Sequence, residues 1–209
     1  MKDQVFKRAD DSSDEAFYAA PRFVTHIDAG AIAAVTQLYR EYLPADGAIL
    51  DLMTSWVSHL PPEVRYSSVT GLGMNAAELA ANPRLTTRIV QNLNSNPLLP
   101  FDTASIDGAC ICVSVDYLTQ PVRVLREVGR VLRGNAPLLI TFSNRCFPTK
   151  VIAPWLELND AGRVALVKNF LELAGNFTAL TALDRSPQRG DPLYALIGHA
   201  TLDRSTSSS

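Results

Sequence analysis

The stretch that decides the fold runs from residue 106 to residue 142 and reads IDGACICVSVDYLTQPVRVLREVGRVLRGNAPLLITF. Its apolar start, residues 106–115, predicts a buried strand. Pro121 then opens a segment in which apolar residues recur at helical spacing on one face, namely Val122, Leu125, Val128 and Leu132. A Gly-Asn pair ends that helix, and residues 137–142 supply another apolar strand. A strand, a helix and a strand in this order predict a parallel pair with a helical crossover.

The segments on either side continue the alternation of strands and helices. Toward the N-terminus the pattern predicts a helix from Asp28 to Pro44, strands over residues 48–52, 68–72 and 89–92, and a short helix capped by Asn75. Toward the C-terminus it predicts a helix over residues 160–175 and strands over 177–183 and 193–199, joined by a turn too short for a crossover. The expected fold is a doubly wound α/β sheet of seven strands, mostly parallel, with an antiparallel C-terminal hairpin.

Length and composition favour one domain. The chain has 209 residues, of which 47% are hydrophobic and 19% charged, enough to bury a continuous core. We expect a single domain over residues 17–200, with the polar residues 1–16 and 201–209 as frayed tails. No apolar stretch approaches the roughly 20 residues of a membrane helix, and the start lacks a secretory signal. A cytoplasmic protein is therefore expected, or an organellar one if a transit peptide has been removed.

Charge and cysteine content exclude several partners. Nineteen basic and twenty-one acidic residues give a net charge of -2, which offers no electrostatic footprint for nucleic acid. The three cysteines, Cys110, Cys112 and Cys146, are odd in number and lack metal-ligand spacing, so reduced thiols and no metal site are expected. The sequence does not indicate an oligomeric state.

Several short motifs carry a resemblance to a known family. They are Leu50-Asp51-Leu52, Leu99-Pro100-Phe101, Ser105-Ile106-Asp107 and, before the strand at 137–142, Arg130-Val131-Leu132-Arg133-Gly134-Asn135. In this order, over about residues 28–200, the chain resembles the class I S-adenosylmethionine-dependent methyltransferases, type 11 group. The resemblance implies a Rossmann-like methyltransferase fold, S-adenosyl-L-methionine as cofactor, and a cofactor site beyond the carboxyl ends of the first four strands.

The cofactor loop departs from the family pattern. Met53, Ser55 and Val57 stand where the family has glycines, and the acid that would bind the ribose falls on Gly73, with Asn75 as the nearest polar replacement. Asn92 aligns with the acid near the adenine, and its amide oxygen can accept the same hydrogen bond. The Pro61-Pro62 pair cuts short the helix after the first strand. The resemblance implies cofactor contacts from Asp51, Met53, Ser55, Gly73, Met74, Asn75, Asn92, Leu93 and Ser114.

Candidates for substrate chemistry lie in the N-terminal segment and in the loops after the first, fourth and fifth strands. Asp116 lies where the family places groups near substrate, so it is a candidate to orient or deprotonate the acceptor, or else a helix N-cap. His59 is a candidate cleft residue near the cofactor loop and His26 a candidate part of an N-terminal lid with Tyr18 and Arg22, and a structural role is the alternative for each histidine. Trp56 covers the cofactor loop or fills the core, and Arg145 belongs to a substrate wall or a solvated loop. The candidate substrate contacts are Tyr18, His26, Trp56, His59, Tyr117, Asn144 and Arg145.

Three functions from different classes are considered, and the motif that the third requires is absent. The first is a methyltransferase that uses S-adenosylmethionine on a small molecule. The second is a non-catalytic binding or regulatory protein of the same fold, suggested by the missing loop glycines. The third, a nicotinamide-dependent oxidoreductase, requires GxGxxG after the first strand, where this chain has no glycine in residues 53–62.

Overall fold

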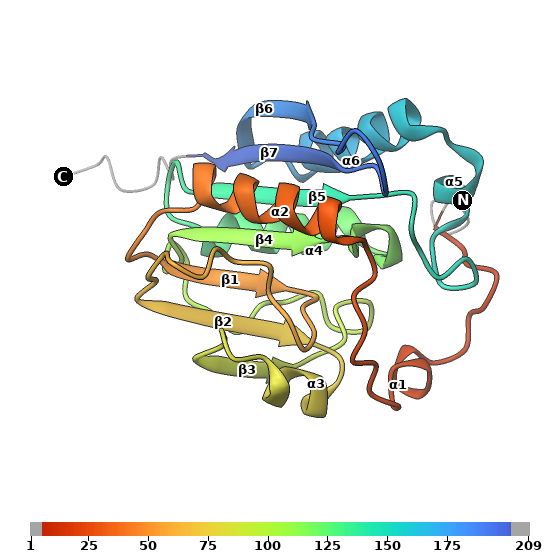
Figure 1. The fold of residues 1–209 in the computed structure, drawn as a ribbon, viewed down its shortest axis with the longest axis horizontal. Helices are drawn as coiled ribbons and strands as arrows, with labels where there is room; N and C mark the ends of the chain where they lie inside the picture. The colour runs from red at the N-terminus through yellow and green to blue at the C-terminus, as the bar shows by residue number, and fades with distance from the viewer. Residues whose placement is uncertain (1–5, 202–209) are drawn as a thin grey trace.

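A seven-stranded sheet forms the centre of the protein, seen in a computed structural model that describes residues 6–201 (Figure 1). Its strands are β1 (Ala48–Leu52), β2 (Ser68–Gly73), β3 (Thr87–Val90), β4 (Gly108–Cys112), β5 (Pro137–Phe142), β6 (Phe177–Asp184) and β7 (Tyr194–Ala200), in the order β3-β2-β1-β4-β5-β7-β6. The first five are parallel, and β7 runs antiparallel between β5 and β6. This confirms the expected fold class.

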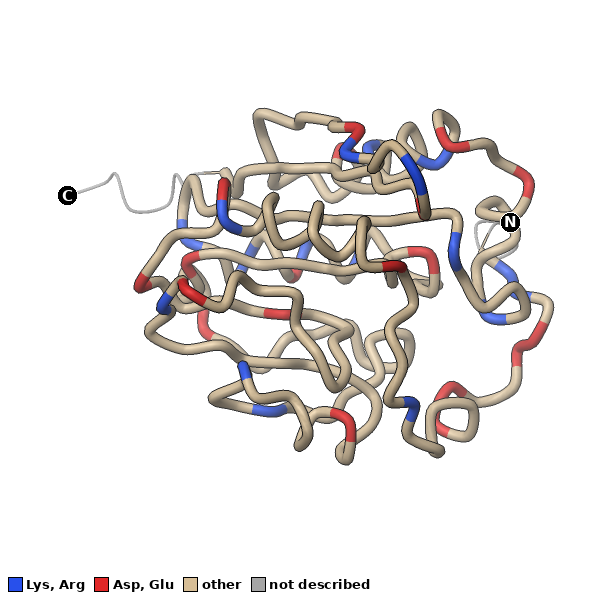
Figure 2. The backbone as a smooth tube through the Cα atoms, viewed as in Figure 1, with Lys and Arg blue, Asp and Glu red and all other residues tan. Residues whose placement is uncertain are grey.

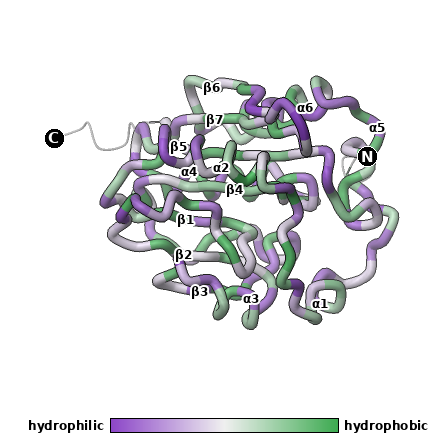
Figure 3. The backbone as a smooth tube through the Cα atoms, in the orientation of Figure 1, coloured by the Kyte–Doolittle hydropathy of each residue, from purple (hydrophilic) through white to green (hydrophobic). Residues whose placement is uncertain are grey.

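Helices cover both faces of the sheet because alternate strand residues point to opposite sides. Ile49 and Leu139 belong to the apolar cluster under α2 (Ala29–Tyr42) and α3 (Ala76–Ala81). Leu50 and Leu138 belong to the cluster under α4 (Pro121–Val131) and α6 (Asp160–Ala174). Hydrophobic positions follow the strands in Figure 3, whereas acidic and basic positions are interspersed over the fold in Figure 2. Among residues 6–201, no helix has the length and apolar character to cross a membrane.

Two strands, β3 and β4, differ from their predicted bounds by two or more residues at each end. β3 spans Thr87–Val90 rather than residues 89–92, because its pairing with β2 starts at Thr70 and ends at Gly73. β4 spans Gly108–Cys112 rather than residues 106–115. Ile106 makes only an isolated bridge to Leu132, and Val113 ends the strand with a φ of 42°. Such a left-handed φ is costly for a β-branched residue, so the strand stops where the chain turns into the loop.

The connection from β1 to β2, residues 53–67, contains no helix, although a shortened one was expected there. The prolines at 61 and 62 disfavour helical continuation. Side chains of the next helix and its C-cap hold the loop instead. Asn82 donates to the Ser55 carbonyl and to Ser58 Oγ, each at 3.0 Å, and Ser55 Oγ donates to a carboxylate oxygen of Glu78.

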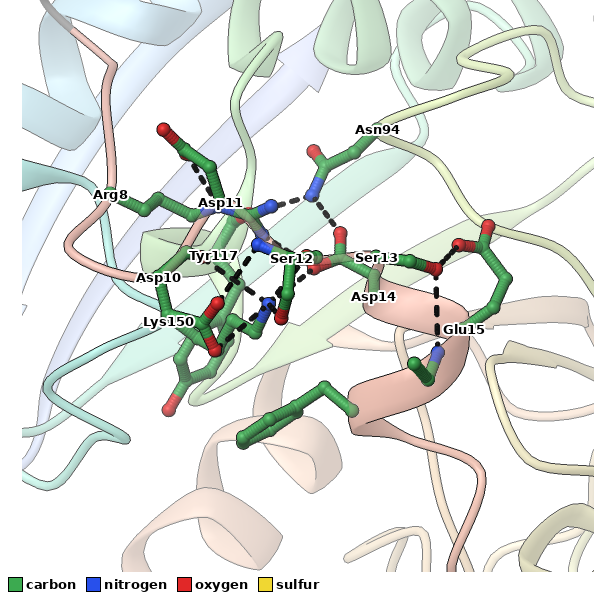
Figure 4. A network of polar contacts seen from close by, with 12 residues as sticks. Arg8, Asp10, Asp11, Ser12, Ser13, Asp14, Glu15, Asn94, Tyr117 and Lys150 are labelled. Atoms are coloured by element: carbon green, nitrogen blue, oxygen red, sulfur yellow. Dashed lines mark hydrogen bonds and ion pairs between the residues drawn. The ribbon is translucent and has the colours of Figure 1, made fainter.

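Residues 6–25, here called the N-terminal strap, lie beyond the carboxyl ends of the central strands. The structure places residues 6–16 there rather than in the expected tail. Residues 1–5 lie outside the described part. Helix α1 (Asp14–Phe17) forms the centre of the strap. Arg8 pairs with Asp14 at 2.6 Å, and Lys150, fully buried, donates to the Ser12 carbonyl at 2.7 Å (Figure 4). Buried charges are stable only when paired and hydrogen-bonded, which explains why this polar segment is ordered. Of the expected C-terminal tail, only Thr201 is described.

A short helix after β5, α5 (Ala153–Glu157), also escaped the sequence patterns. It buries Trp155, which is 1% exposed and packs edge-on against Phe142. The segment is too short for helical periodicity to reveal it.

Candidate functional site

A cavity of about 150 Å³ lies beyond the carboxyl ends of β1, β2 and β4, where the strand order reverses. Ligands of doubly wound sheets bind at this switch point. The arrowheads of these strands in Figure 1 point toward the N-terminal strap, which closes the cavity with Arg8, Asp14, Tyr18 and Arg22. The predicted site residues that line this cavity are Tyr18, His26, Asp51, Met53, Ser55, Trp56, His59, Gly73, Met74, Asn92, Leu93, Ser114 and Tyr117.

Met53 takes the backbone conformation that favours glycine. Its φ is 54°, in the left-handed region, at the position where the family has a loop glycine. Only glycine visits this region without a steric penalty, which for other residues is roughly 1–2 kcal/mol. Met53 is half-buried and packs against the apolar cluster under α4 and α6. The loop therefore keeps a glycine-like turn without the glycine.

Asp51 is buried at the end of β1, with 3% of its surface exposed. Ser58 Oγ donates to Asp51 Oδ2, and Cys110 Sγ lies 3.5 Å from Oδ1. Burial raises the pKa of Asp51 above its usual value. The carboxyl group therefore links the β1–β2 loop to the sheet while it lines the cavity.

Asn75 does not line the cavity, which corrects its expected role at the ribose. Its Oδ1 accepts from the backbone nitrogens of Ala77 and Glu78 and so caps α3. Its Nδ2 donates to the carbonyls of Tyr18 and Ala19, at 2.9 and 3.0 Å. With both ends of the amide engaged, Asn75 anchors the strap to α3.

Glu78 is one of the lining residues that are absent from the sequence-based candidates. It lines the cavity from the first turn of α3, where Oε1 accepts from the Arg22 backbone nitrogen at 2.6 Å and Oε2 accepts from Ser55 Oγ at 2.7 Å. The signal for it was available, because an acid three residues after an N-cap is a helix-start pattern. Each oxygen of Glu78 has a second lone pair for a ligand.

Asn92 contacts the strap from the end of β3. Its Nδ2 donates to Glu15 Oε1 at 2.7 Å, and its Oδ1 accepts from the Asn94 backbone nitrogen at 2.9 Å. Hydrogen bonds from Ser13 and Asn92 lower the pKa of Glu15 to about 2. The strap therefore covers the place where the family resemblance puts the adenine.

Two histidines face the cavity as proton acceptors. Burial lowers the pKa of His26. The nearby Glu78 carboxylate raises this pKa, and the Arg22 guanidinium lowers it. Burial and the neighbouring His26 lower the pKa of His59. Both imidazoles are therefore neutral near pH 7 and can accept a proton.

Some polar atoms of the cavity lining are buried without a partner. Within residues 6–201, Ser114 Oγ, Arg22 Nη1 and Tyr39 Oη make no hydrogen bond. Buried polar groups are normally satisfied, so each exception in the lining is a candidate contact for a ligand. A donor on Arg22, a hydroxyl on Ser114 and the carboxylate of Glu78 fit a ligand with both charged and hydroxyl groups.

Besides Asn75, three predicted residues do not line this cavity. Asp116, in a 3₁₀ turn (Val115–Tyr117), is 2% exposed and lines neither this cavity nor its neighbour, so its expected role as a base lacks a route to substrate. Burial raises the pKa of Asp116 to about 8. Asn144 is exposed and lines neither cavity. Arg145 pairs with Asp191 at 2.7 Å and lines a second cavity.

Comparisons with known proteins agree with this architecture. Residues 52–140 match the type 11 family model described as "Methyltransferase domain". No curated protein matches the chain significantly.

Solved structures share the fold at low sequence identity. The [4+2]-cyclase SpnF is 14% identical, with a TM-score of 0.61 over 80% of each chain. An S-adenosylmethionine-dependent methyltransferase from Mesorhizobium loti is 16% identical, with a TM-score of 0.58 over 79% of this chain and 97% of that one. Geranyl diphosphate C-methyltransferase from Streptomyces coelicolor, solved with geranyl diphosphate and S-adenosyl-L-homocysteine, is 10% identical, with a TM-score of 0.57 over 81% and 80%. The type 11 methyltransferase model thus matches residues 52–140, and these solved structures show that the chain shares the fold of S-adenosylmethionine-dependent methyltransferases.

Proposed function

We propose that the protein binds S-adenosyl-L-methionine in the cavity at the β1–β4 switch point and transfers its methyl group to a small molecule. The observation that carries this proposal is the convergence of Glu78, Asn92 and Arg22 on one cavity in a methyltransferase fold. When bound, the cofactor supplies an electrophilic methyl group. The protein must then orient the acceptor, exclude water and take up a proton.

Each of the three side chains suits one part of the cofactor. The Glu78 carboxylate accepts hydrogen bonds from ribose hydroxyls and so replaces the acidic residue that the family has at the position of Gly73. Asn92 Oδ1, which accepts from the Asn94 backbone nitrogen, has a second lone pair that can accept from the adenine amino group. Arg22 Nη1, a buried donor without a partner in the described residues, suits the cofactor carboxylate. Glu78 therefore takes the ribose role that the sequence had assigned to Asn75.

A charge-neutral variant of Glu78 tests the cofactor assignment. E78Q is expected to weaken the binding of S-adenosylmethionine and of S-adenosylhomocysteine by roughly 10- to 100-fold, because a hydrogen bond to a charged group contributes about 1.5–3 kcal/mol. Titration calorimetry measures both affinities. Glu172 is half exposed on α6, so E172Q is the matched control. Equal affinities in E78Q and E172Q contradict the assignment.

A second candidate function, a non-catalytic binding protein, is favoured by Met53 in the glycine conformation and by the engagement of Asp51 with Ser58. The [4+2]-cyclase among the similar structures shows that this fold also serves other chemistry. Incubation with methyl-labelled cofactor and a small-molecule extract distinguishes the methyltransferase from the non-catalytic binding protein. Labelled product supports the methyltransferase, and binding without any transfer supports the alternative.

A further inference from the structure

A second cavity, of about 440 Å³, adjoins the first. Its volume lies within the range typical of small-molecule sites. Its wall consists of Thr25, His26, Ile27, Asp28, Tyr117, Arg145, Cys146, Phe147 and Asp191. Four of these residues also line the first cavity, namely Thr25, His26, Tyr117 and Phe147. The two cavities therefore meet at one shared wall.

The shared wall is aromatic and carries one proton acceptor. The His26 ring packs edge-on against Phe147, with ring centroids 5.3 Å apart. Tyr117 Oη accepts a hydrogen bond from the Phe147 backbone nitrogen at 2.8 Å and so fixes this wall to the 3₁₀ turn after β4. An apolar or aromatic body can pack here while a polar atom reaches the imidazole.

Arg145, whose side chain is 63% exposed, is an oriented cation in the lining of the second cavity. Arg145 Nε donates to Asp191 Oδ1 at 2.7 Å. Asp191 Oδ2 accepts from the Asp28 backbone nitrogen at 3.0 Å, and Asp28 Oδ2 accepts from the Asp191 nitrogen at 2.7 Å. Neither Nη of Arg145 donates to any residue in the described part of the chain. These contacts engage the carboxylates of Asp28 and Asp191 and leave the two Nη atoms of Arg145 available for an anionic group.

We propose that the second cavity is the methyl-acceptor site, for a small aromatic or apolar acid whose anionic group binds Arg145 and whose hydroxyl or amine lies against His26. This inference rests on the proposed function. The acceptor atom forms its bond to the methyl carbon, the sulfur–carbon bond breaks with its electron pair left on sulfur, and the acceptor proton passes to an imidazole nitrogen of His26. Thr25 and Tyr117 complete the wall between donor and acceptor.

The charged and titratable groups around His26 come from several elements. On the first-cavity side they are His59, Glu78 and Arg22. On the second-cavity side they are Asp28, Arg145, Cys146 and Asp191. A neutral His26 can accept a hydrogen bond from an acceptor hydroxyl, and a protonated His26 cannot.

Calorimetric titration with 4-hydroxybenzoate tests the anion site, in the presence and in the absence of saturating S-adenosylhomocysteine. R145Q is expected to weaken probe binding at least about tenfold, because a charge-assisted contact is lost. Binding of 4-methylphenol, which lacks the anionic group, should change by less than about twofold, within the small effect expected for an uncharged contact. Arg189 is exposed and lines neither cavity, so R189Q is the matched control.

The pH dependence of the same titration tests His26. Probe affinity is expected to fall as pH decreases from roughly 8 to 5. H26Q should remove most of this dependence, since glutamine still accepts a hydrogen bond but does not titrate, whereas H59Q should retain it. Circular dichroism of each variant confirms that the fold is intact.

The outcomes separate the two proposals. Absence of S-adenosylhomocysteine binding with normal probe binding overturns the proposed function and leaves the acid site supported. Absence of probe binding, equal probe affinity in R145Q and R189Q, or an unchanged pH profile in H26Q overturns the acceptor-site inference, whatever the cofactor result.

Discussion

Replacement of Asp14 by asparagine (D14N) is expected to release the N-terminal strap from its place beyond the carboxyl ends of the strands. Asp14 is 5% exposed, and its carboxylate contacts Arg8 Nη1 at 2.6 Å, Lys150 Nζ at 3.7 Å and Asn94 Nδ2 at 2.9 Å (Figure 4). Without it, Arg8 loses its partner at 2.6 Å, and Lys150 is left with Asp10, whose Oδ2 lies 3.3 Å from Nζ. Breaking a buried pair from one side typically costs about 3–5 kcal/mol, which corresponds to at least a hundredfold change in the docking equilibrium.

Hydrogen exchange measures this release. The Asp10 amide, which donates to the Thr149 carbonyl at 2.8 Å, reports docking of the strap, and the amides of β4 and β5 report the sheet. D14N should accelerate exchange at Asp10 and leave the sheet amides nearly unchanged. Asp11 is an adjacent acid with 71% of its side chain exposed, so D11N is the control, with an expected effect below about 1 kcal/mol. Similar exchange in D14N and D11N would contradict the prediction.

Replacement of Asp116 by asparagine (D116N) is expected to stabilise the protein, increasingly so as pH rises. Asp116 is buried, its Oδ2 has no partner among residues 6–201, and its pKa rises from the ordinary 3.8 to about 8. A raised carboxyl pKa means that the folded state holds a proton that the unfolded state releases. The stability that this group contributes is therefore present below pH 3.8 and lost as pH rises through about 8.

D116N has no proton to lose at this position. Its free energy of unfolding, relative to that of the original chain, should therefore grow by roughly 2–4 kcal/mol between pH 5 and pH 8. Urea unfolding at the two pH values measures the difference. D102N, at an exposed acid, should show no such growth. A constant difference between D116N and the original chain, or a loss of stability at pH 8, is incompatible with an unpaired buried carboxylate.

The sheet was predictable because its determinants are local. The run at 137–142 became β5 with unchanged bounds, and Asn75 and Gly175 cap and end their helices as their residue types indicate. The ends of β3 and β4 were not predictable, because pairing with a neighbouring strand set the first and a left-handed Val113 ended the second.

The candidate site was predictable where it follows strand ends and not where it depends on long-range contacts. Met53, Gly73 and Ser114 line the cavity because each comes shortly after a strand or ends one. The sequence placed Tyr18 within the domain but not residues 6–16, because the contacts that hold this segment, such as that of Ser12 with Lys150, join residues 138 positions apart. Glu78 looked like an ordinary helix-start acid until the fold placed it beside Arg22 and Ser55.

The two tryptophans occupy contrasting environments, which gives the protein a built-in optical reporter. Trp56 lines the first cavity, is partly exposed and donates to the Val24 carbonyl at 3.0 Å, whereas Trp155 is enclosed in the core beside Phe142. Occupation of the cavity changes the solvation of one indole and leaves the other as an internal reference. Emission at long wavelength should therefore follow ligand entry in the unmodified chain, and emission at short wavelength should follow unfolding.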